Sequence, residues 1–171
     1  ITSEALAMIN EENQIHLLAH PGWHEGVLGI VAGKIMNQTG KPTIVLGIKD
    51  QSVAKGSGRS IEALNLFDML NEMRELFTFF GGHHAAVGLT MPAENIPELQ
   101  DRMNAYIEEK QIDLSKGPVL VIDEIVSPKD VTVEQIATLK LLAPFGTDNP
   151  VPNFLFKLSL TNIKIIYKCY S

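Results

Sequence analysis

Apolar positions in the first 50 residues follow two different spacings. Residues 15–19 predict a short strand, and residues 43–48 are a continuous apolar run of strand length, which is typical of a strand covered on both faces. Between them, residues 25–37 place apolar side chains three and four positions apart, which predicts a helix that ends at Gly40. A strand, a helix and a second strand in this order predict a βαβ unit with a right-handed crossover.

Strand-like and helix-like segments keep alternating after this unit. Residues 53–60 are expected to form a polar, glycine-interrupted strand, and Asn65 is placed to cap a helix that runs to about residue 77. We expect Gly81-Gly82-His83 to be the turn at which this helical pattern stops and a strand over residues 86–91 begins.

One more helix closes this part of the chain. Pro97 suits the first turn of a helix, because its missing amide hydrogen is not needed there. The apolar residues that follow have helical spacing and predict a buried stripe. They are Leu99, Met103, Tyr106 and Ile107.

The pattern changes after a polar joint that contains Gly117-Pro118. Strands are expected over residues 119–125, 154–160 and 163–167, with one helix between the first two. That helix starts at a capping box, Thr132-Val133-Glu134-Gln135. We therefore predict three parts: residues 1–14 as the end of a connecting helix, 15–115 as an α/β domain, and 116–171 as a small β-barrel cut off before it closes.

Composition restricts the class of protein. The chain has 171 residues, 45% of them hydrophobic, and a net charge of −6, which favours a folded protein without a broad basic surface for polyanions. No apolar run is long enough for a membrane span, and Cys169 is the single cysteine. We expect a cytoplasmic protein, no membrane partner, and a piece of a longer chain.

Ser57, Gly58 and Arg59 are the first candidates for chemistry. Ser57 and Arg59 lie two positions apart, so both side chains leave an extended strand on the same face, and the flanking glycines clear space around them. A hydroxyl and a guanidinium on one open face suit a terminal phosphate. The alternative is an arginine in a solvated loop with no ligand.

Gly81-Gly82-His83 and His24 are the second candidates. Two glycines let a ligand approach the backbone closely, and His83 can supply a donor or a proton. His24 precedes a glycine-rich helix, whose N-terminus could attract a phosphate or carboxylate. The alternative is that the glycines only shape a turn and His83 is structural.

Metal binding and nucleophilic catalysis have weak sequence support. His20 and His24 have the i, i+4 interval, but Pro21-Gly22 prevents the helix that would align them. No Gly-x-Ser-x-Gly motif is present. The residues alone therefore predict an anion pocket, and they predict neither a metal site nor a set of catalytic residues in this chain.

Three stretches resemble the DHH-associated domain of the RecJ family, which belongs to the DHH phosphoesterase superfamily. They are residues 20–32 (HPGWHEGVLGIVA), 56–60 (GSGRS) and 81–88 (GGHHAAVG), and residues 142–154 (LAPFGTDNPVPNF) resemble the OB-type domain that follows in the same family. The resemblance implies an α/β fold, with a mixed β-sheet and helices on both faces, followed by a partial OB-like β-barrel. Val87 departs from the family pattern, which usually has alanine there.

The resemblance also implies roles for the candidate residues. Ser57, Gly58, Arg59 and Ser60 match the residues with which the family binds a 5′-terminal phosphate. Gly81, Gly82 and His83 match the motif that faces the scissile phosphate, with His83 in the catalytic role, and His24 matches the cleft wall. The Mn²⁺ or Mg²⁺ ions of the family are held by an upstream DHH domain, and this sequence has no DHH triplet.

Two classes of function remain open on this evidence. The first is the substrate-binding portion of a 5′→3′ single-stranded-DNA exonuclease of DNA repair and recombination, with single-stranded DNA and the upstream DHH domain as partners. The second is a non-catalytic nucleic-acid or protein interaction module whose glycines are structural. Part of an oligoribonuclease or cyclic-dinucleotide phosphodiesterase is a further alternative, although such enzymes do not need an OB-type domain.

Overall fold

The structure is a computed structural model that describes residues 1–115, 121–129, 131–146 and 149–156. The chain divides into two compact units, Ile1–Pro118 and Val119–Ser171, which we describe separately. Helices that are both long and apolar enough to cross a membrane do not occur in the described part.

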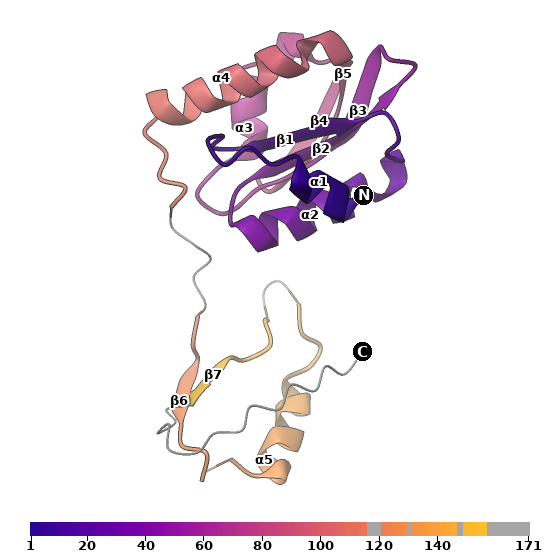
Figure 1. Ribbon diagram of the computed structural model, residues 1–171. Coiled ribbons are helices and arrows are strands. Elements are labelled where there is room, and N and C mark those ends of the chain that lie inside the picture. Colours follow the sequence, from indigo (N-terminus) through magenta and orange to yellow (C-terminus); the bar gives the residue numbers. More distant parts are fainter. Residues whose placement is uncertain (116–120, 130, 147–148, 157–171) are drawn as a thin grey trace. The chain divides into compact units, whose positions relative to one another are not determined.

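The first unit is built on one mixed five-stranded sheet in the order β1-β2-β3-β5-β4 (Figure 1). Its strands are β1 (His16–His20), β2 (Thr43–Lys49), β3 (Val53–Arg59), β4 (Phe79–His83) and β5 (Ala86–Pro92). The β1 and β2 strands are parallel and are joined through α2 (Leu28–Thr39), so the predicted βαβ unit is confirmed. All other neighbouring strands are antiparallel.

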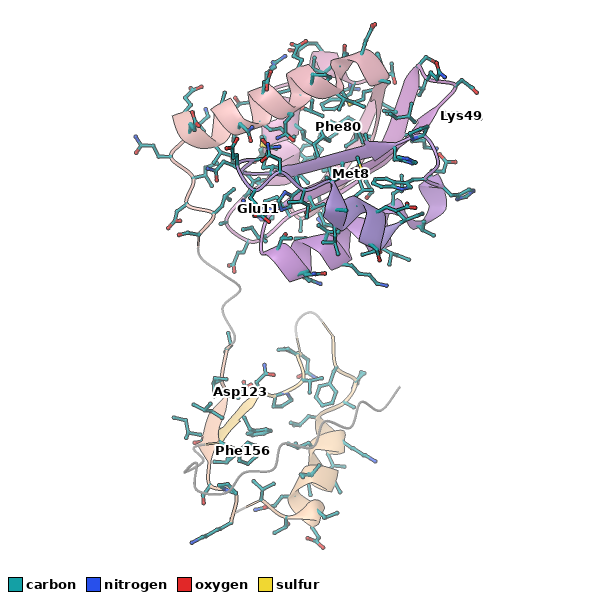
Figure 2. The ribbon with its side chains drawn as sticks, viewed as in Figure 1. Met8, Glu11, Lys49, Phe80, Asp123 and Phe156 are labelled. Carbon is teal, nitrogen blue, oxygen red and sulfur yellow. The ribbon has the colours of Figure 1, made fainter. Side chains whose placement is uncertain are left out.

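Helices cover both faces of this sheet, as the resemblance implies. On one face, α1 (Thr2–Ala7) and α2 enclose a cluster of buried side chains with β1 and β2 (Figure 1). The 3-10 turn η1 (Glu25–Val27) directly precedes α2 in the chain. On the other face, α3 (Leu66–Asn71) and α4 (Ile96–Glu109) enclose the larger core. Phe80 packs in this second layer, stacked between Phe67 and Phe77 (Figure 2).

The predicted turn at Gly81-Gly82-His83 is wrong. These residues belong to β4, which starts at Phe79 and pairs along its whole length with β5. The turn comes later, at His84-Ala85, between the paired residues His83 and Ala86. The helical pattern stops earlier than expected, because α3 ends at Asn71 and only a 3-10 turn, η2 (Arg74–Leu76), follows before β4.

Several local signals are confirmed. Gly40 ends α2 with φ 72°, the left-handed conformation that glycine adopts without strain. The Asn65 side chain accepts a hydrogen bond from the Asp68 amide at the start of α3. Pro97 lies in the first turn of α4, after the 3-10 turn η3 (Ala93–Asn95), and Leu99, Met103 and Ile107 are buried.

The second unit is described in part. It contains β6 (Glu124–Val126) and β7 (Phe154–Phe156), which pair in parallel, and α5 (Val133–Thr138) followed by η4 (Leu139–Leu142). The predicted capping box of Thr132 and Gln135 is present at the start of α5. The predicted strand over 163–167 and Cys169 lie outside the described residues, and a closed barrel is not shown.

His16 is a buried polar residue of this unit whose ring lacks hydrogen bonds within the described part of the chain. It is 1% exposed, and neither ring nitrogen has a hydrogen-bond partner among the described residues. Burial lowers the pKa of His16 from its ordinary 6.5, and the charge of Lys41 lowers it further. The protonated ring is therefore less stable in the folded chain than in the unfolded chain.

This gives a pH dependence of stability. The unfolded chain binds a proton at His16 near pH 6.5 while the folded chain resists it, so the free energy of unfolding falls as the pH falls below about 6.5. We expect His16→Leu to flatten this slope and the control Thr43→Val, at another buried polar position whose side chain does not titrate, to leave the slope unchanged. Urea unfolding at several pH values, followed by fluorescence of the buried Trp23, measures it. Equal slopes in wild type and His16→Leu would refute the assignment.

Candidate functional site

Three adjacent strands bring the predicted residues of β3 and β4 together across β5. Directly opposed residues of antiparallel strands point to the same face. Arg59 of β3 lies opposite Ala86 of β5, which lies opposite His83 of β4, and these three residues form a row across the strands. Two more rows on the same face follow the same strand order. We call these nine residues the open face: Arg59, Ala86 and His83; Ser57, Gly88 and Gly81; and Lys55, Thr90 and Phe79.

Arg59 has a fixed and uncompensated guanidinium on this face. Its Nη1 donates to Ser57 Oγ at 2.7 Å and to the Gly58 carbonyl at 2.8 Å. In the described part of the chain, no carboxylate forms an ion pair with it, and the hydrogen bonds found use Nη1 alone. A half-buried arginine with unused donors is suited to an anion.

The glycine face of α2 makes room for this side chain. A Cβ placed on Gly29 would lie 2.8 Å from Arg59 Nη2 and 3.3 Å from Ser57 Oγ, closer than such contacts tolerate. Gly33 lies next to the Arg59 stem, with 3.9 Å between the position of a Cβ and Arg59 Cγ. The helix therefore packs on β3 with the arginine between them.

Ser57 positions Arg59. Its hydroxyl donates to the Val87 carbonyl at 2.9 Å and accepts from Arg59 Nη1. The sequence suggested that the Ser57 hydroxyl donates a hydrogen bond to a phosphate, but in the structure this hydroxyl already donates its proton to the Val87 carbonyl. Ser57 instead holds the guanidinium in place on the open face.

Gly58 and Ser60 lie away from the open face. A Cβ on Gly58 would lie 2.8 Å from side-chain carbons of both Leu66 and Val87, so this glycine permits close packing in the core. Ser60 is 7% exposed, and its hydroxyl donates to the Leu64 carbonyl. Gly58 reaches Arg59 only through its carbonyl, and Ser60 supports the end of β3.

Gly81, Gly82 and Gly88 have different roles within the same hairpin. No heavy atom lies within 4 Å of a Cβ placed on Gly88, and Gly81 has only the Phe79 ring tip, at 3.9 Å. Gly82 has φ 150°, and a Cβ there would collide with the Ala86 carbonyl. Gly81 and Gly88 thus form a bare floor, whereas Gly82 is needed by the backbone.

His83 is exposed at the end of the edge strand β4. Both His83 and Arg59 are opposite Ala86, so they are two inter-strand spacings apart, about 10 Å. The structure therefore places them at the same end and on the same face of the sheet.

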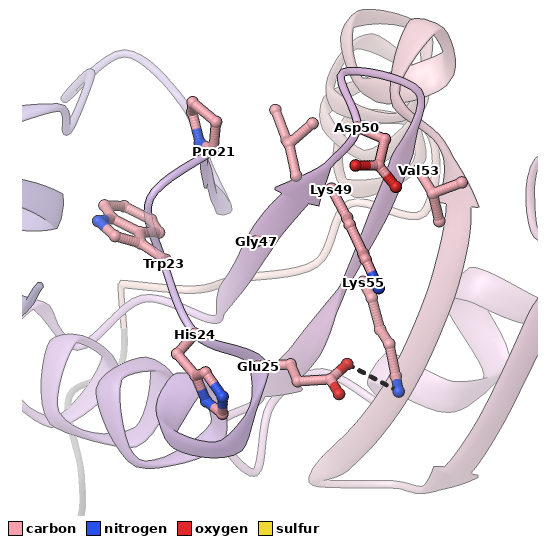
Figure 3. Close-up of a pocket in the computed structure, with 10 residues that line it drawn as sticks. Pro21, Trp23, His24, Glu25, Gly47, Lys49, Asp50, Val53 and Lys55 are labelled. Atoms are coloured by element: carbon pink, nitrogen blue, oxygen red, sulfur yellow. Dashed lines mark ion pairs between the residues drawn. The ribbon is translucent and has the colours of Figure 1, made fainter.

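His24 lies in the loop between β1 and α2. Its Nδ1 accepts a hydrogen bond from the Gly26 amide at 3.2 Å and caps η1. It also lines a hollow of about 490 Å³ beside the β2–β3 turn (Figure 3). Lys55 and Glu25 form an ion pair at 2.8 Å in this hollow, and Lys55 holds the pKa of the Glu25 carboxyl below its ordinary value.

Metal ligands are not clustered in the part of the chain that the structure describes. Within it, no group of three or more His, Cys, Asp or Glu side chains is placed to hold an ion. His20 Nδ1 accepts from the Gly22 amide, which shows a structural use of that histidine.

Lys55 and Phe79 are site residues that were not predicted from the sequence. Both belong to the open face, Lys55 two residues before Ser57 and Phe79 two residues before Gly81. Strand periodicity could have identified Lys55, because residues 55, 57 and 59 are two positions apart and share one face of a strand. Phe79 could be found only once β4 was known to be a strand.

Comparisons with known proteins identify the family of this chain. The DHHA1 domain family model matches residues 11–109, and the RecJ OB domain model matches residues 122–169. The single-stranded-DNA-specific exonuclease RecJ of Bacillus subtilis is 40% identical over 159 residues, which cover 91% of this chain and 20% of that protein. The Escherichia coli protein of the same name is 34% identical over 140 residues, covering 79% of this chain and 24% of that protein.

Solved structures show the same fold. RecJ from Thermus thermophilus in complex with Mn²⁺ matches with a TM-score of 0.75 and 26% identity, over 91% of this chain and 23% of that chain. Its complex with Mg²⁺ matches with a TM-score of 0.72 and 25% identity, over 88% of this chain and 23% of that chain. This chain thus spans about a fifth to a quarter of these relatives. The resemblance to RecJ is confirmed, and the chain belongs to the DHHA1 domain family.

Proposed function

We propose that this chain is the substrate-binding part of a 5′→3′ single-stranded-DNA exonuclease and that the open face holds the 5′-terminal phosphate of the strand. Its relatives are named single-stranded-DNA-specific exonucleases. The observation that carries the proposal is the fixed guanidinium of Arg59, which has no carboxylate partner among the described residues and lies beside a bare glycine floor.

The residues of the open face divide the work of binding. Arg59 offers Nε and Nη2 to the phosphate oxygens, and Ser57 keeps the guanidinium in one orientation, which reduces the entropy lost on binding. Gly81 and Gly88 let the sugar-phosphate backbone lie directly on the sheet. His83, at the far corner, donates to the scissile phosphate and stabilises charge that develops there.

The other predicted residues have supporting roles in this proposal. Gly58 and Ser60 fix the end of β3 from the core side. Gly82 shapes the hairpin that presents His83. His24 forms part of a wall beside Lys55, where the strand leaves the open face.

Divalent metals belong to another part of the enzyme in this proposal. The relatives from Thermus thermophilus were solved with Mg²⁺ or Mn²⁺. The described residues of this chain contain no cluster of ligands that fits such an ion, so we assign the metals to an upstream DHH domain. There they would supply two-metal phosphodiester hydrolysis, while this chain orients the strand.

The first test is recognition of the 5′ phosphate. Wild type should bind a 5′-phosphorylated single strand about tenfold or more tightly than the same strand with a 5′ hydroxyl, because the phosphate makes charge-assisted hydrogen bonds. Arg59→Ala should lose this preference, and Arg59→Lys should recover part of it, since lysine keeps the charge but not the planar fork. Fluorescence anisotropy with the two oligonucleotides measures all three proteins.

Arg102→Ala is the matched control, because Arg102 lies on α4, which covers the opposite face of the sheet, and pairs with Glu75. It should keep the full preference for the 5′ phosphate. Equal affinity for both strands in wild type and in Arg59→Ala would rule out a phosphate site at Arg59.

The second test fills the floor. Gly88→Val adds a side chain where no atom lies within 4 Å, and valine favours a strand, so the urea midpoint should stay the same or rise. Affinity for single-stranded DNA should nevertheless fall several-fold, since the backbone can no longer reach the sheet. Ala105→Val adds apolar bulk at an exposed position of α4, which covers the opposite face of the sheet, and should bind normally. Unchanged binding by a stable Gly88→Val would contradict the proposed path.

The third test separates catalysis from simple binding. In an enzyme that also contains the catalytic domain, His83→Ala should lower kcat, because a group that touches the scissile phosphate acts on the transition state. His84→Ala, the neighbouring turn residue, is the control. A full kcat in His83→Ala would favour the interaction-module interpretation.

A further inference from the structure

Phe79 is unusually placed for an aromatic residue. It is 62% exposed, whereas the adjacent Phe80 is packed between Phe67 and Phe77 on the opposite face of the sheet. Because neighbouring residues of a strand alternate between faces, Phe79 lies on the open face. Covering a large apolar ring that is exposed to water lowers the free energy of the system, so an exposed ring favours a binding partner.

The ring leans over the glycine floor. Its tip, Cζ, lies 3.9 Å from the position of a Cβ on Gly81, so the side chain follows β4 toward Gly81. Gly81 and Gly88 are in the row of Ser57, the residue that holds the guanidinium of Arg59. The ring tip and the guanidinium are thus on opposite sides of a bare strip about two inter-strand spacings, or about 10 Å, wide.

We propose that Phe79 is a stacking platform for a base of the bound single strand, so that the open face holds a nucleotide with its phosphate at Arg59, its sugar over Gly81 and Gly88, and its base on the ring. The inference rests on the proposed function and adds a base contact to it. A nucleotide places its phosphate and its base on opposite sides of the sugar, which fits the width of the strip.

The charges of the open face favour a nucleic acid as the occupant. None of its nine residues is acidic, and Arg59 and Lys55 contribute positive charge. The neighbouring Glu25 is paired with Lys55. An exposed aromatic ring on a face that carries a cation without a carboxylate partner is the arrangement by which proteins bind single strands without sequence preference, because every base has a face that can stack. Phe79 should therefore tolerate any base.

The experiment pairs a protein variant with a DNA lesion. A 5′-phosphorylated single strand carries one abasic site, moved through the first four nucleotides. Wild type should lose about fivefold or more in affinity at one of these positions, the size of a single stacking contact. Phe79→Ala should lose the same factor on the intact strand and nothing further at that position, while Phe79→Trp should bind like wild type.

A fluorescent base and a surface control strengthen the test. 2-Aminopurine at the critical position should be quenched on binding to wild type and much less on binding to Phe79→Ala. Met8→Ala removes another exposed apolar side chain, 45% exposed at the end of α1 and outside both the open face and the hollow, and should behave like wild type.

The contrary outcomes separate this inference from the proposed function. If Phe79→Ala binds intact DNA like wild type, or loses the same factor at every abasic position, the stacking contact is refuted even where the preference for a 5′ phosphate persists. If wild type itself shows no such preference, the proposed phosphate site fails. A change of oligomeric state in Phe79→Ala with unchanged DNA affinity would show that a second copy of the chain covers the ring, and would also overturn the inference.

Discussion

The close packing of α2 on β3 is the constraint on which the candidate site depends. The guanidinium of Arg59 occupies the space that a side chain at Gly29 would fill, and Ser57 and Gly58 hold it from the strand. Glycine within a helix costs roughly 0.5–1 kcal/mol relative to alanine, so this arrangement weakens α2 in order to keep a charged group in one orientation. A preorganised guanidinium loses little freedom when an anion binds, which is the physical advantage that offsets the cost.

The glycines of β3, β4 and β5 serve opposite purposes on the two faces of the sheet. On the core face, Gly58 faces Val87 and Leu66 so closely that neither neighbour would fit against a larger residue. Val87, which departs from the family pattern, is 2% exposed and is accommodated because Gly58 lies opposite it. On the open face, Gly81 and Gly88 touch almost nothing. Space that packing does not use is what makes the second pair of glycines candidates for ligand binding.

The features that could be predicted from the sequence are those encoded locally. The βαβ unit follows from apolar spacing, the caps at Gly40 and Asn65 follow from residue type, and the common face of Ser57 and Arg59 follows from a separation of two. The strand β4 could not be predicted in this way. Its double aromatic continues a helical pattern, and only pairing with β5, a tertiary interaction, makes Phe79–His83 a strand. The exposure of Phe79 depends on the same pairing. The burial of Ser60 depends on the chain that follows β3, where the Ser60 hydroxyl donates to the Leu64 carbonyl, and this could not be predicted from the strand pattern either.

The charge of the chain also matters for how such a site works. With a net charge of −6, this chain by itself provides no long-range attraction for a polyanion. Affinity must then come from contacts at short range, where direction matters more than total charge. The open face has the required parts: a guanidinium fixed by two hydrogen bonds, a lysine whose partner Glu25 lies outside the face, and a floor on which a backbone can lie. In the proposed function, such a site would distinguish the end of a strand from its interior, because a terminal phosphate carries more charge and fewer substituents than an internal one.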